Sequence, residues 1–162
     1  MVGIGYDIHR LVEGRPLYLG GVKIDFRFGL LGHSDGDVLL HAICDALLGA
    51  ANLGDLGTHF PPEDKKYKNI SSLKLLKKVG DFLKNSGFFT KNVDAVVIAE
   101  KPKIIPYVTE MKKQISHTLS IAPEHISIKG KTNEGIGDIG EGKAIAAIAI
   151  CDIGRIYDTF ER

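Results

Sequence analysis

Residues 33 to 50 read HSDGDVLLHAICDALLGA, and this stretch decides most of what the sequence predicts about the fold. Nearly every position after Asp37 is apolar, which is typical of a helix buried on all sides. Ser34 and Asp37 have the S-x-x-D spacing of a capping box, so we expect Ser34 to cap the helix. The stretch therefore predicts a buried helix from about residue 36 to residue 50.

Three polar residues interrupt this apolar helix. Asp37, His41 and Asp45 recur at i, i+4 and i+8, so they form one stripe along it. Buried polar groups cost free energy unless they are hydrogen-bonded, and buried charges cost more. The stripe therefore predicts a metal, a ligand or a hydrogen-bond network.

Predicted strands and helices alternate along the rest of the chain. Periodicity and turn residues predict strands over 2–7, 93–99 and 126–131, a hairpin over 17–24 that turns at Gly20-Gly21, and helices over 71–86 and around Pro106 to Leu119. Residues 144–153 are apolar, and periodicity leaves strand or helix open, although their isoleucines favour a buried strand. The alternation predicts an α/β or α+β fold with helices on one face of a mixed sheet.

Length and composition narrow the function classes. With 162 residues, 44% of them hydrophobic, the chain is expected to form one domain over residues 1–162. A net charge of +1 argues against nucleic-acid binding, and no apolar run reaches membrane-span length. Cys44 and Cys151 are expected to be free thiols in a reducing compartment. No signal segment opens the chain, so we expect a cytoplasmic protein, or one in a plastid-type organelle if the chain is a processed precursor.

A D-x-H pair near the N-terminus supplies candidate metal ligands. Asp7 and His9 share one face of a predicted strand. With His41 they make a set of three ligands that leaves a fourth position open, as in catalytic zinc sites. Spacing alone is equally consistent with three satisfied polar residues. Asp45 is the expected hydrogen-bond partner of the outer ring nitrogen of His41.

Three further segments suggest phosphate or nucleotide binding. His33 and Ser34 precede a helix N-terminus, where free N–H groups and the helix dipole attract anions, although Ser34 as a simple cap also fits. Residues 129–143 combine glycines with lysines and a threonine that can hold phosphate, but a structural loop fits equally. The turn over residues 99–105 has backbone that can read a nucleobase, or it is a plain connection.

Together these segments resemble the 2-C-methyl-D-erythritol 2,4-cyclodiphosphate synthases over essentially the whole chain. The motifs that carry the resemblance are GYDIH at 5–9, HSDGD at 33–37, HA at 41–42, DALLGA at 45–50, GDLG at 54–57, FP at 60–61, PK at 102–103 and KTNE at 131–134. The block over residues 33–50 is highly specific to that family. With it, metal binding becomes the expected function of Asp7, His9 and His41.

The resemblance implies a fold, an assembly and a reaction. It implies an α/β subunit with a four-stranded mixed sheet and helices on one face, assembled as a homotrimer with active sites between subunits. The implied enzyme is a cyclase that converts 4-diphosphocytidyl-2-C-methyl-D-erythritol 2-phosphate into the 2,4-cyclodiphosphate and CMP, in the non-mevalonate isoprenoid pathway. Zinc is implied on Asp7, His9 and His41, and Mg²⁺ or Mn²⁺ on the substrate phosphates.

The resemblance also implies roles for single residues. His33 and Thr132 match residues that stabilise the transition state, and Ser34 matches a phosphate contact. Asp55 and Gly57 match contacts to the erythritol hydroxyls, with Leu56, Phe60 and Asp64 expected beside them. The cytosine pocket is implied at Ala99, Glu100, Lys101, Pro102, Lys103, Ile104 and Ile105, and contacts to the cytidine diphosphate at Lys131, Asn133 and Glu134.

Two positions depart from the family's pattern. Pro62 stands where some relatives have an acidic residue after F-P, which puts a role of that loop in ligand contact in doubt. Many relatives have an arginine in G-R-G-E-G, whereas this chain has Glu141 there, in GEGKA at 140–144. Lys143 is therefore expected to supply the missing phosphate contact, or else to pair with Glu141.

Two other functions fit the residues without the resemblance. Three ligands and a water suit a zinc hydrolase of phosphate or amide substrates, although no glutamate stands beside the ligands as a base. A trimeric small-molecule binder with a structural metal is the non-catalytic alternative. Release of CMP on turnover separates the synthase from both.

Overall fold

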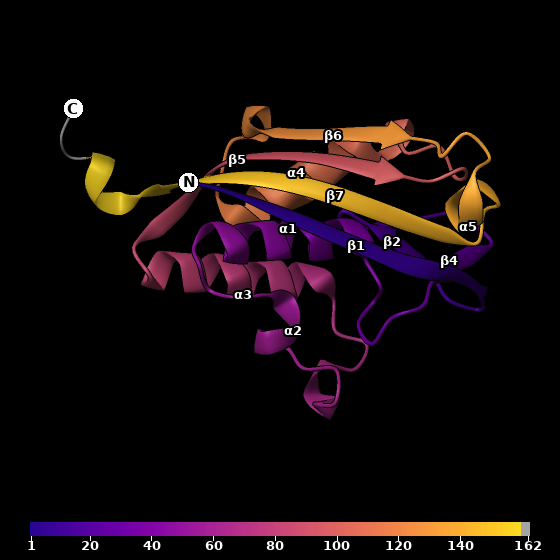
Figure 1. The fold of residues 1–162 in the computed structure, drawn as a ribbon, viewed down its shortest axis with the longest axis horizontal. Helices are drawn as coiled ribbons and strands as arrows, with labels where there is room; N and C mark the ends of the chain where they lie inside the picture. Colours follow the sequence, from indigo (N-terminus) through magenta and orange to yellow (C-terminus); the bar gives the residue numbers. More distant parts are fainter. Residues whose placement is uncertain (160–162) are drawn as a thin grey trace.

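The structure is a computed structural model that describes residues 1–159. Strands and helices alternate along it as the sequence predicts (Figure 1). The strands are β1 (Val2–Glu13), β2 (Leu17–Leu19), β3 (Val22–Ile24), β4 (Phe28–Leu30), β5 (Phe88–Ile98), β6 (Ile126–Lys131) and β7 (Ala144–Arg155). The α-helices are α1 (Val38–Ala50), α2 (Leu56–His59), α3 (Ser72–Asn85), α4 (Val108–Leu119) and α5 (Gly137–Gly140). Short 3₁₀ helices are η1 (Lys65–Tyr67), η2 (Ile105–Tyr107), η3 (Pro123–His125) and η4 (Ile156–Thr159).

Five strands form the main sheet in the order β4-β1-β7-β5-β6, and only β5 and β6 run parallel. The expectation of four strands is therefore wrong by one. The additional strand is β4, which pairs with the end of β1 from Leu11 to Glu13, beyond the predicted end of that strand. Three residues are too few to give a periodic pattern, so the sequence does not reveal β4. The predicted hairpin is confirmed as β2 and β3, which turn at Gly20-Gly21.

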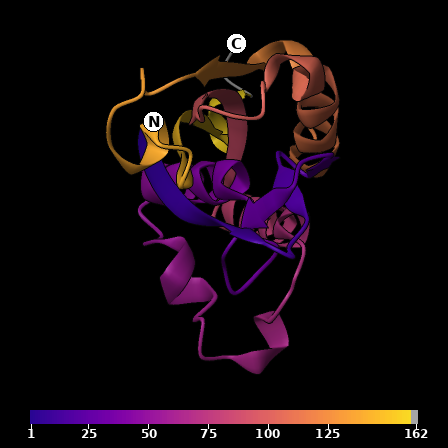
Figure 2. The same ribbon diagram turned by 90° about the vertical axis from the view of Figure 1, so that its right-hand side faces the viewer.

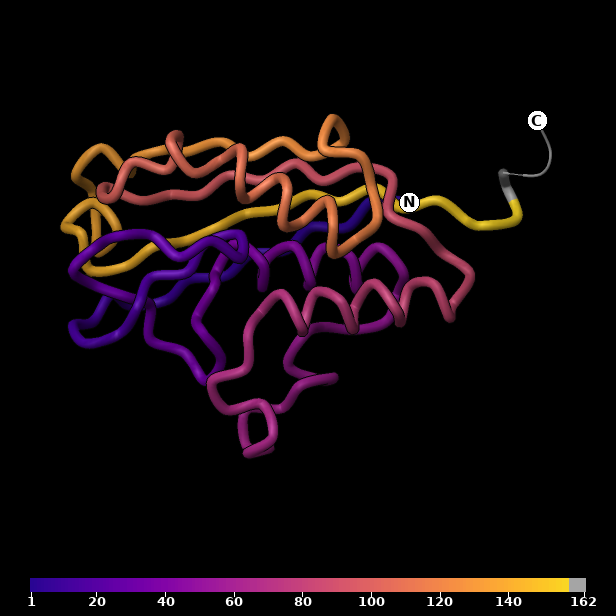
Figure 3. The backbone as a smooth tube through the Cα atoms, turned by 180° about the vertical axis from the view of Figure 1, so that it is seen from behind, coloured from indigo at the N-terminus to yellow at the C-terminus, as the bar shows by residue number. Residues whose placement is uncertain are grey.

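The long helices gather on one side of the main sheet (Figures 2 and 3). α1 packs on β1 and β7, α3 packs on α1, and α4 contacts α3 and β6. The largest side chains of the core are wholly buried, among them Leu39, Leu40, Ile43, Leu47 and Leu48 of α1. This confirms the prediction of a helix buried on all sides. Within residues 1–159, no helix is both long and apolar enough to cross a bilayer.

Two glycines of β1 let α1 approach the strand very closely. A Cβ atom at Gly5 would overlap the carbonyl oxygen of Ala42, and one at Gly3 would overlap that of Ala46. Because side chains alternate along a strand, the next residues on this face of β1 are Asp7 and His9. The close contact therefore brings both side chains to the level of α1.

Asp37, not Ser34, caps α1, so the expected role of Ser34 as a cap is wrong. The Asp37 carboxylate accepts the N–H of Leu40 at 3.1 Å and also the N–H groups of Gly20 and Gly21, at 3.0 and 2.7 Å. Asp37 is wholly buried, and burial beside Asp35 raises its pKa while the three N–H donors oppose that shift. One member of the predicted polar stripe is thus satisfied by a hydrogen-bond network.

We predict that Gly5→Ala lowers the free energy of unfolding by about 1–3 kcal/mol, the usual cost of overpacking a close contact. Urea denaturation measures this change. Gly49→Ala is the matched control, because a Cβ atom there meets nothing within 4 Å, and alanine is the better helix former by about 1 kcal/mol. Equal stability of the two variants would show that α1 is free to move away from β1.

Candidate metal centre and substrate pocket

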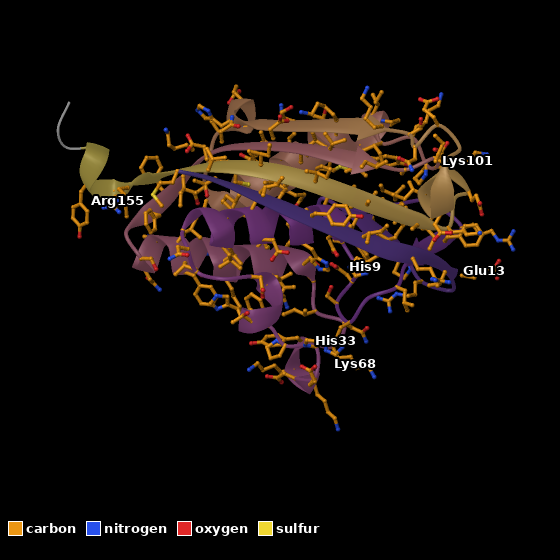
Figure 4. The ribbon with its side chains drawn as sticks, viewed as in Figure 1. His9, Glu13, His33, Lys68, Lys101 and Arg155 are labelled. Atoms are coloured by element: carbon orange, nitrogen blue, oxygen red, sulfur yellow. The ribbon has the colours of Figure 1, made fainter. Side chains whose placement is uncertain are left out.

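Three polar side chains from two elements converge at the contact between β1 and α1. Oδ2 of Asp7 lies 2.9 Å from Nε2 of His9 and 2.9 Å from Nδ1 of His41. The two ring nitrogens lie 3.3 Å apart. Figure 4 shows His9 on the side of β1 that faces the helices. Within residues 1–159 this is the group whose ligand atoms lie close enough together to hold a metal ion.

The hydrogen bond of Nδ1 of His9, the ring nitrogen farther from Asp7, leaves the other nitrogen suited to bind a metal. Nδ1 of His9 lies 2.6 Å from the carbonyl oxygen of Leu31, and because a carbonyl only accepts, Nδ1 carries the proton. In the neutral imidazole Nε2 of His9 has a lone pair that a metal would take up, and in the protonated imidazole Nε2 donates to Asp7. Ligand atoms around a tetrahedral zinc are about 3.3 Å apart, close to the three distances found here.

The pKa values of Asp7 and His9 are both shifted at this site. Burial would raise the pKa of Asp7, but hydrogen bonds with His41 and His9 hold it well below its ordinary value. Burial would lower the pKa of His9, but the hydrogen bond and charge of Asp7 raise it. A carboxylate that stays ionised beside two imidazoles is a donor set suited to zinc.

The expected partner of His41, Asp45, lies elsewhere. The Asp45 carboxylate accepts the backbone N–H of Leu56 at 2.7 Å and so holds the start of α2. Nε2 of His41 is instead 3.0 Å from the hydroxyl of Ser34 and 3.0 Å from that of Ser72. The sequence does not predict that Ser72 contacts His41, because that contact depends on where α3 packs.

A cavity of about 240 Å³ opens beside the candidate metal ligands. His9, His33, Ser34 and His41 line it from one side. The remaining lining residues are Leu56, Gly57, Phe60, Pro62, Tyr67, Ile70 and Leu75. Besides His9 and His41, five residues of the expected site line this cavity: His33, Ser34, Leu56, Gly57 and Phe60. Pro62, where the chain departs from the family's pattern, lines it as well.

Asp55 and Asp64, two acidic residues expected near the erythritol, accept backbone N–H groups and do not line the cavity. Asp55 caps α2 by accepting the N–H and the hydroxyl of Thr58, at 2.7 and 2.8 Å. Asp64 caps η1 and pairs with Lys66 at 2.7 Å, and its carbonyl lies 3.4 Å from Nε2 of His33. These hydrogen bonds lower the pKa of both carboxyls. Each residue thus shapes a loop at the edge of the cavity.

The expected nucleotide residues form a second cluster, where β5 and β6 end. The carboxylate of Glu100 accepts the N–H of Asn133 at 2.7 Å and that of Gly135 at 3.4 Å, which ties the 99–105 turn to the loop after β6. In that loop the hydroxyl of Thr132 donates to the carboxylate of Glu134 at 3.1 Å. Figure 4 places Lys101 at this end of the sheet, away from His9 and His33.

One chain does not bring the two clusters together. No residue of the 99–105 turn or of the 131–134 segment lines the cavity beside the metal ligands. In the sheet, β7 separates β1, which carries Asp7 and His9, from β5 and β6. We call the two clusters the metal half-site (Asp7, His9, His33, Ser34 and His41) and the nucleotide half-site (residues 99–105 and 131–134).

Lys143 belongs to neither half-site. Its ammonium group pairs with Glu141 and lies 3.7 Å from Asp138, and these contacts raise its pKa, the hydrogen bond to Glu141 most of all. With Ile8 and Arg10 it lines a separate hollow. Within one chain, Lys143 therefore follows the expected alternative of pairing with Glu141.

Comparison with known proteins gives this geometry a family. The sequence profile of the YgbB family matches residues 1–154. The 2-C-methyl-D-erythritol 2,4-cyclodiphosphate synthase of Agathobacter rectalis is 55% identical over 157 residues, which are 97% of this chain and 89% of that protein.

Solved structures agree. The bifunctional IspDF of Campylobacter jejuni superposes with a TM-score of 0.92 at 41% identity over 95% of this chain, which spans 42% of that longer protein. The IspF of Plasmodium falciparum in complex with CDP gives a TM-score of 0.83 at 39% identity, over 95% of each chain. The chain therefore belongs to the YgbB family, the family of the 2-C-methyl-D-erythritol 2,4-cyclodiphosphate synthases.

Proposed function

We propose that the chain converts 4-diphosphocytidyl-2-C-methyl-D-erythritol 2-phosphate into 2-C-methyl-D-erythritol 2,4-cyclodiphosphate and CMP, in the non-mevalonate isoprenoid pathway. The observation that carries the proposal is the convergence of Asp7, His9 and His41 beside a cavity lined by His33 and Ser34. Family membership supplies the substrate, because the relatives are named for its cyclic product.

The reaction is a displacement at phosphorus. An oxygen of the 2-phosphate forms a bond to the β-phosphorus, and the bond from that phosphorus to the bridging oxygen breaks, so that the oxygen leaves with CMP. Three anionic groups must meet for this to happen, which is costly without positive charge nearby. Positioning and charge stabilisation therefore carry most of the catalysis, with little need for an acid or base.

The metal half-site would hold the diphosphate. Asp7, His9 and His41 would hold zinc, which when bound supplies Lewis-acid stabilisation of phosphate charge, and Mg²⁺ or Mn²⁺ would be held mainly by the substrate. Ser34 lines the cavity, where its hydroxyl would donate to a phosphate oxygen, and the imidazole of His33 would stabilise the charge that develops. Leu56, Gly57 and Phe60 line the same cavity and would surround the erythritol.

The nucleotide half-site would hold the cytidine. Backbone groups of the 99–105 turn would read the cytosine, and Lys131, Asn133 and Glu134 would hold the cytidine diphosphate. Thr132 would stabilise the transition state. The complex of the Plasmodium falciparum relative with CDP supports a nucleotide ligand. Glu100 would act through the loop, because its carboxylate is already bonded to backbone N–H groups.

A homotrimer would join the two half-sites across a subunit interface. The face of β1 that turns away from α1 is apolar and uncovered: Val2 and Ile4 are 69% exposed, Tyr6 55% and Ile8 42%. Ile150 of β7, which pairs with Ile4, continues this row at 46%. Contiguous exposed apolar surface of this kind marks an interface. A trimer built on this outer face of the sheet supports active sites between neighbours, each using one half-site from either chain.

We place the enzyme in the cytoplasm on the strength of its two cysteines. Cys44 and Cys151 are both buried and free. Burial raises the pKa of Cys151 to about 12, so its thiol is inert. Unpaired thiols are typical of reducing compartments.

We predict that the unaltered chain, supplied with substrate, zinc and magnesium, gives the cyclic diphosphate and one CMP per turnover. Phosphorus NMR follows both products. His41→Ala removes one metal ligand and should lower the rate by at least about 100-fold, because charge stabilisation at phosphorus is lost. Hydrolysis of the substrate without a cyclic product would favour the zinc hydrolase instead.

We predict that Glu100→Ala lowers kcat/KM by about 10–100-fold, because small displacements of a binding loop are costly in catalysis. The preference for the cytidine substrate over its uridine analogue should remain, since backbone reads the base. Glu124→Ala is the matched control, an exposed glutamate on η3 at which we expect no change. A loss of base preference in Glu100→Ala would mean that the side chain itself reads the cytosine.

We predict that two inactive variants restore activity when mixed. His41→Ala damages the metal half-site and Lys131→Ala the nucleotide half-site. In trimers reassembled from equal amounts, about a quarter of the interfaces combine two intact half-sites, so activity should recover toward that fraction of the unaltered enzyme. If the mixture stays as inactive as its components, the active site lies within one chain.

A further inference from the structure

A line of hydrogen bonds connects the metal ligand His41 to a carboxylate that the reaction does not use. Nε2 of His41 lies 3.0 Å from Oγ of Ser72, and that oxygen lies 2.5 Å from Oδ1 of Asp35. Ser72 is wholly buried at the start of α3. We propose that Ser72 and Asp35 are positioning residues that fix the tautomer and orientation of His41 and thereby strengthen binding of a divalent metal.

The direction of each hydrogen bond follows from the groups involved. The Asp35 carboxylate only accepts, so the single hydroxyl proton of Ser72 goes to it. The Ser72 oxygen then offers only lone pairs to His41, and Nε2 of His41 must be the donor. In the neutral ring the other nitrogen, Nδ1, has the lone pair, and it lies beside Oδ2 of Asp7 and Nε2 of His9, where a metal would take it up. A neutral imidazole held in this way is ready to bind a metal.

Ser34 does not replace Ser72 in this arrangement. Its hydroxyl is also 3.0 Å from Nε2 of His41, and it accepts the N–H of Gly36 at 3.2 Å. Among the hydrogen bonds of residues 1–159, however, none joins Ser34 to a carboxylate. Its hydroxyl lies 3.4 Å from that of Ser72, and because the Ser72 proton goes to Asp35, Ser34 is the donor in that long contact. A phosphate oxygen in the cavity would be the stronger acceptor for this proton. Ser72 sets the tautomer, and Ser34 faces the substrate.

The competing explanation is that Asp35 only caps the start of α3. Its carboxylate accepts the backbone N–H of Ser72 at 2.9 Å and that of Asp37 at 3.1 Å, which joins the loop before α1 to the start of α3. In that case the Ser72 hydroxyl would be irrelevant to the metal. Ser72→Ala separates the two, because it removes the hydroxyl and keeps the backbone N–H.

The test measures zinc affinity by competition with a chelator, without any turnover. It rests on the metal site proposed above. Ser72→Ala should weaken zinc binding by about 10–100-fold, the usual effect of removing a partner of a metal-bound histidine. Ser71→Ala is the matched control, since the side chain of Ser71 makes no capping hydrogen bond, and it should stay within about twofold. The visible spectrum of the Co²⁺-substituted protein should change in Ser72→Ala only.

A second variant tests the line itself. Asp35→Asn keeps an acceptor for the N–H at the start of α3 but loses the negative charge, so it should also weaken zinc binding. This variant provides the test if Ser72→Ala does not fold. The double variant should bind zinc no more weakly than Ser72→Ala alone. The inference is overturned if Ser72→Ala has the same zinc affinity and Co²⁺ spectrum as Ser71→Ala. It is also overturned if the losses of zinc affinity in Ser72→Ala and Asp35→Asn add fully in the double variant. If the unaltered chain binds zinc but gives no cyclic product, the proposed reaction fails while this inference stands.

Discussion

The contact between β1 and α1 is the constraint on which the rest of the structure depends. Gly3 and Gly5 have no side chain to hold the helix away, so the backbone of α1 lies directly on the strand. His41 sits one residue before Ala42, the point of contact with Gly5. Any larger residue at these two positions would move the imidazole away from Asp7 and His9. Core packing and ligand geometry are therefore set by the same contact.

In the proposed trimer, the separation of the two half-sites makes assembly a condition of catalysis. A bound substrate carries phosphate groups at one end and a nucleobase at the other, and the cavity beside the metal half-site contains no residue of the nucleotide half-site. Glu100 keeps the nucleotide half-site in shape without help from the metal half-site. Each half-site is thus prepared separately, and the interface only has to bring them into register.

Local patterns predicted much of the fold and the three candidate metal ligands, whereas contacts between distant segments had to come from the structure. Asp7, His9 and His41 were singled out by period 2 on a strand and by a polar stripe on a buried helix, and the family resemblance then favoured a metal over a set of satisfied polar residues. Ser72 was not, because its contact with His41 spans 31 residues of sequence and depends on how α3 packs. Asp37 replaced Ser34 as the cap because the β2–β3 turn supplies two more N–H donors to its carboxylate, a contact that no local motif encodes.

β1 is a strand with two functional faces. Gly3, Gly5, Asp7 and His9 face α1, while Val2, Ile4, Tyr6 and Ile8 face outward to the proposed interface. Because these sets alternate, shifting the strand by one residue would exchange them completely, burying tyrosine and isoleucine against the helix and putting the metal ligands outside. Insertion or deletion of a residue in this strand is consequently expected to be far more damaging than substitution of most of its side chains.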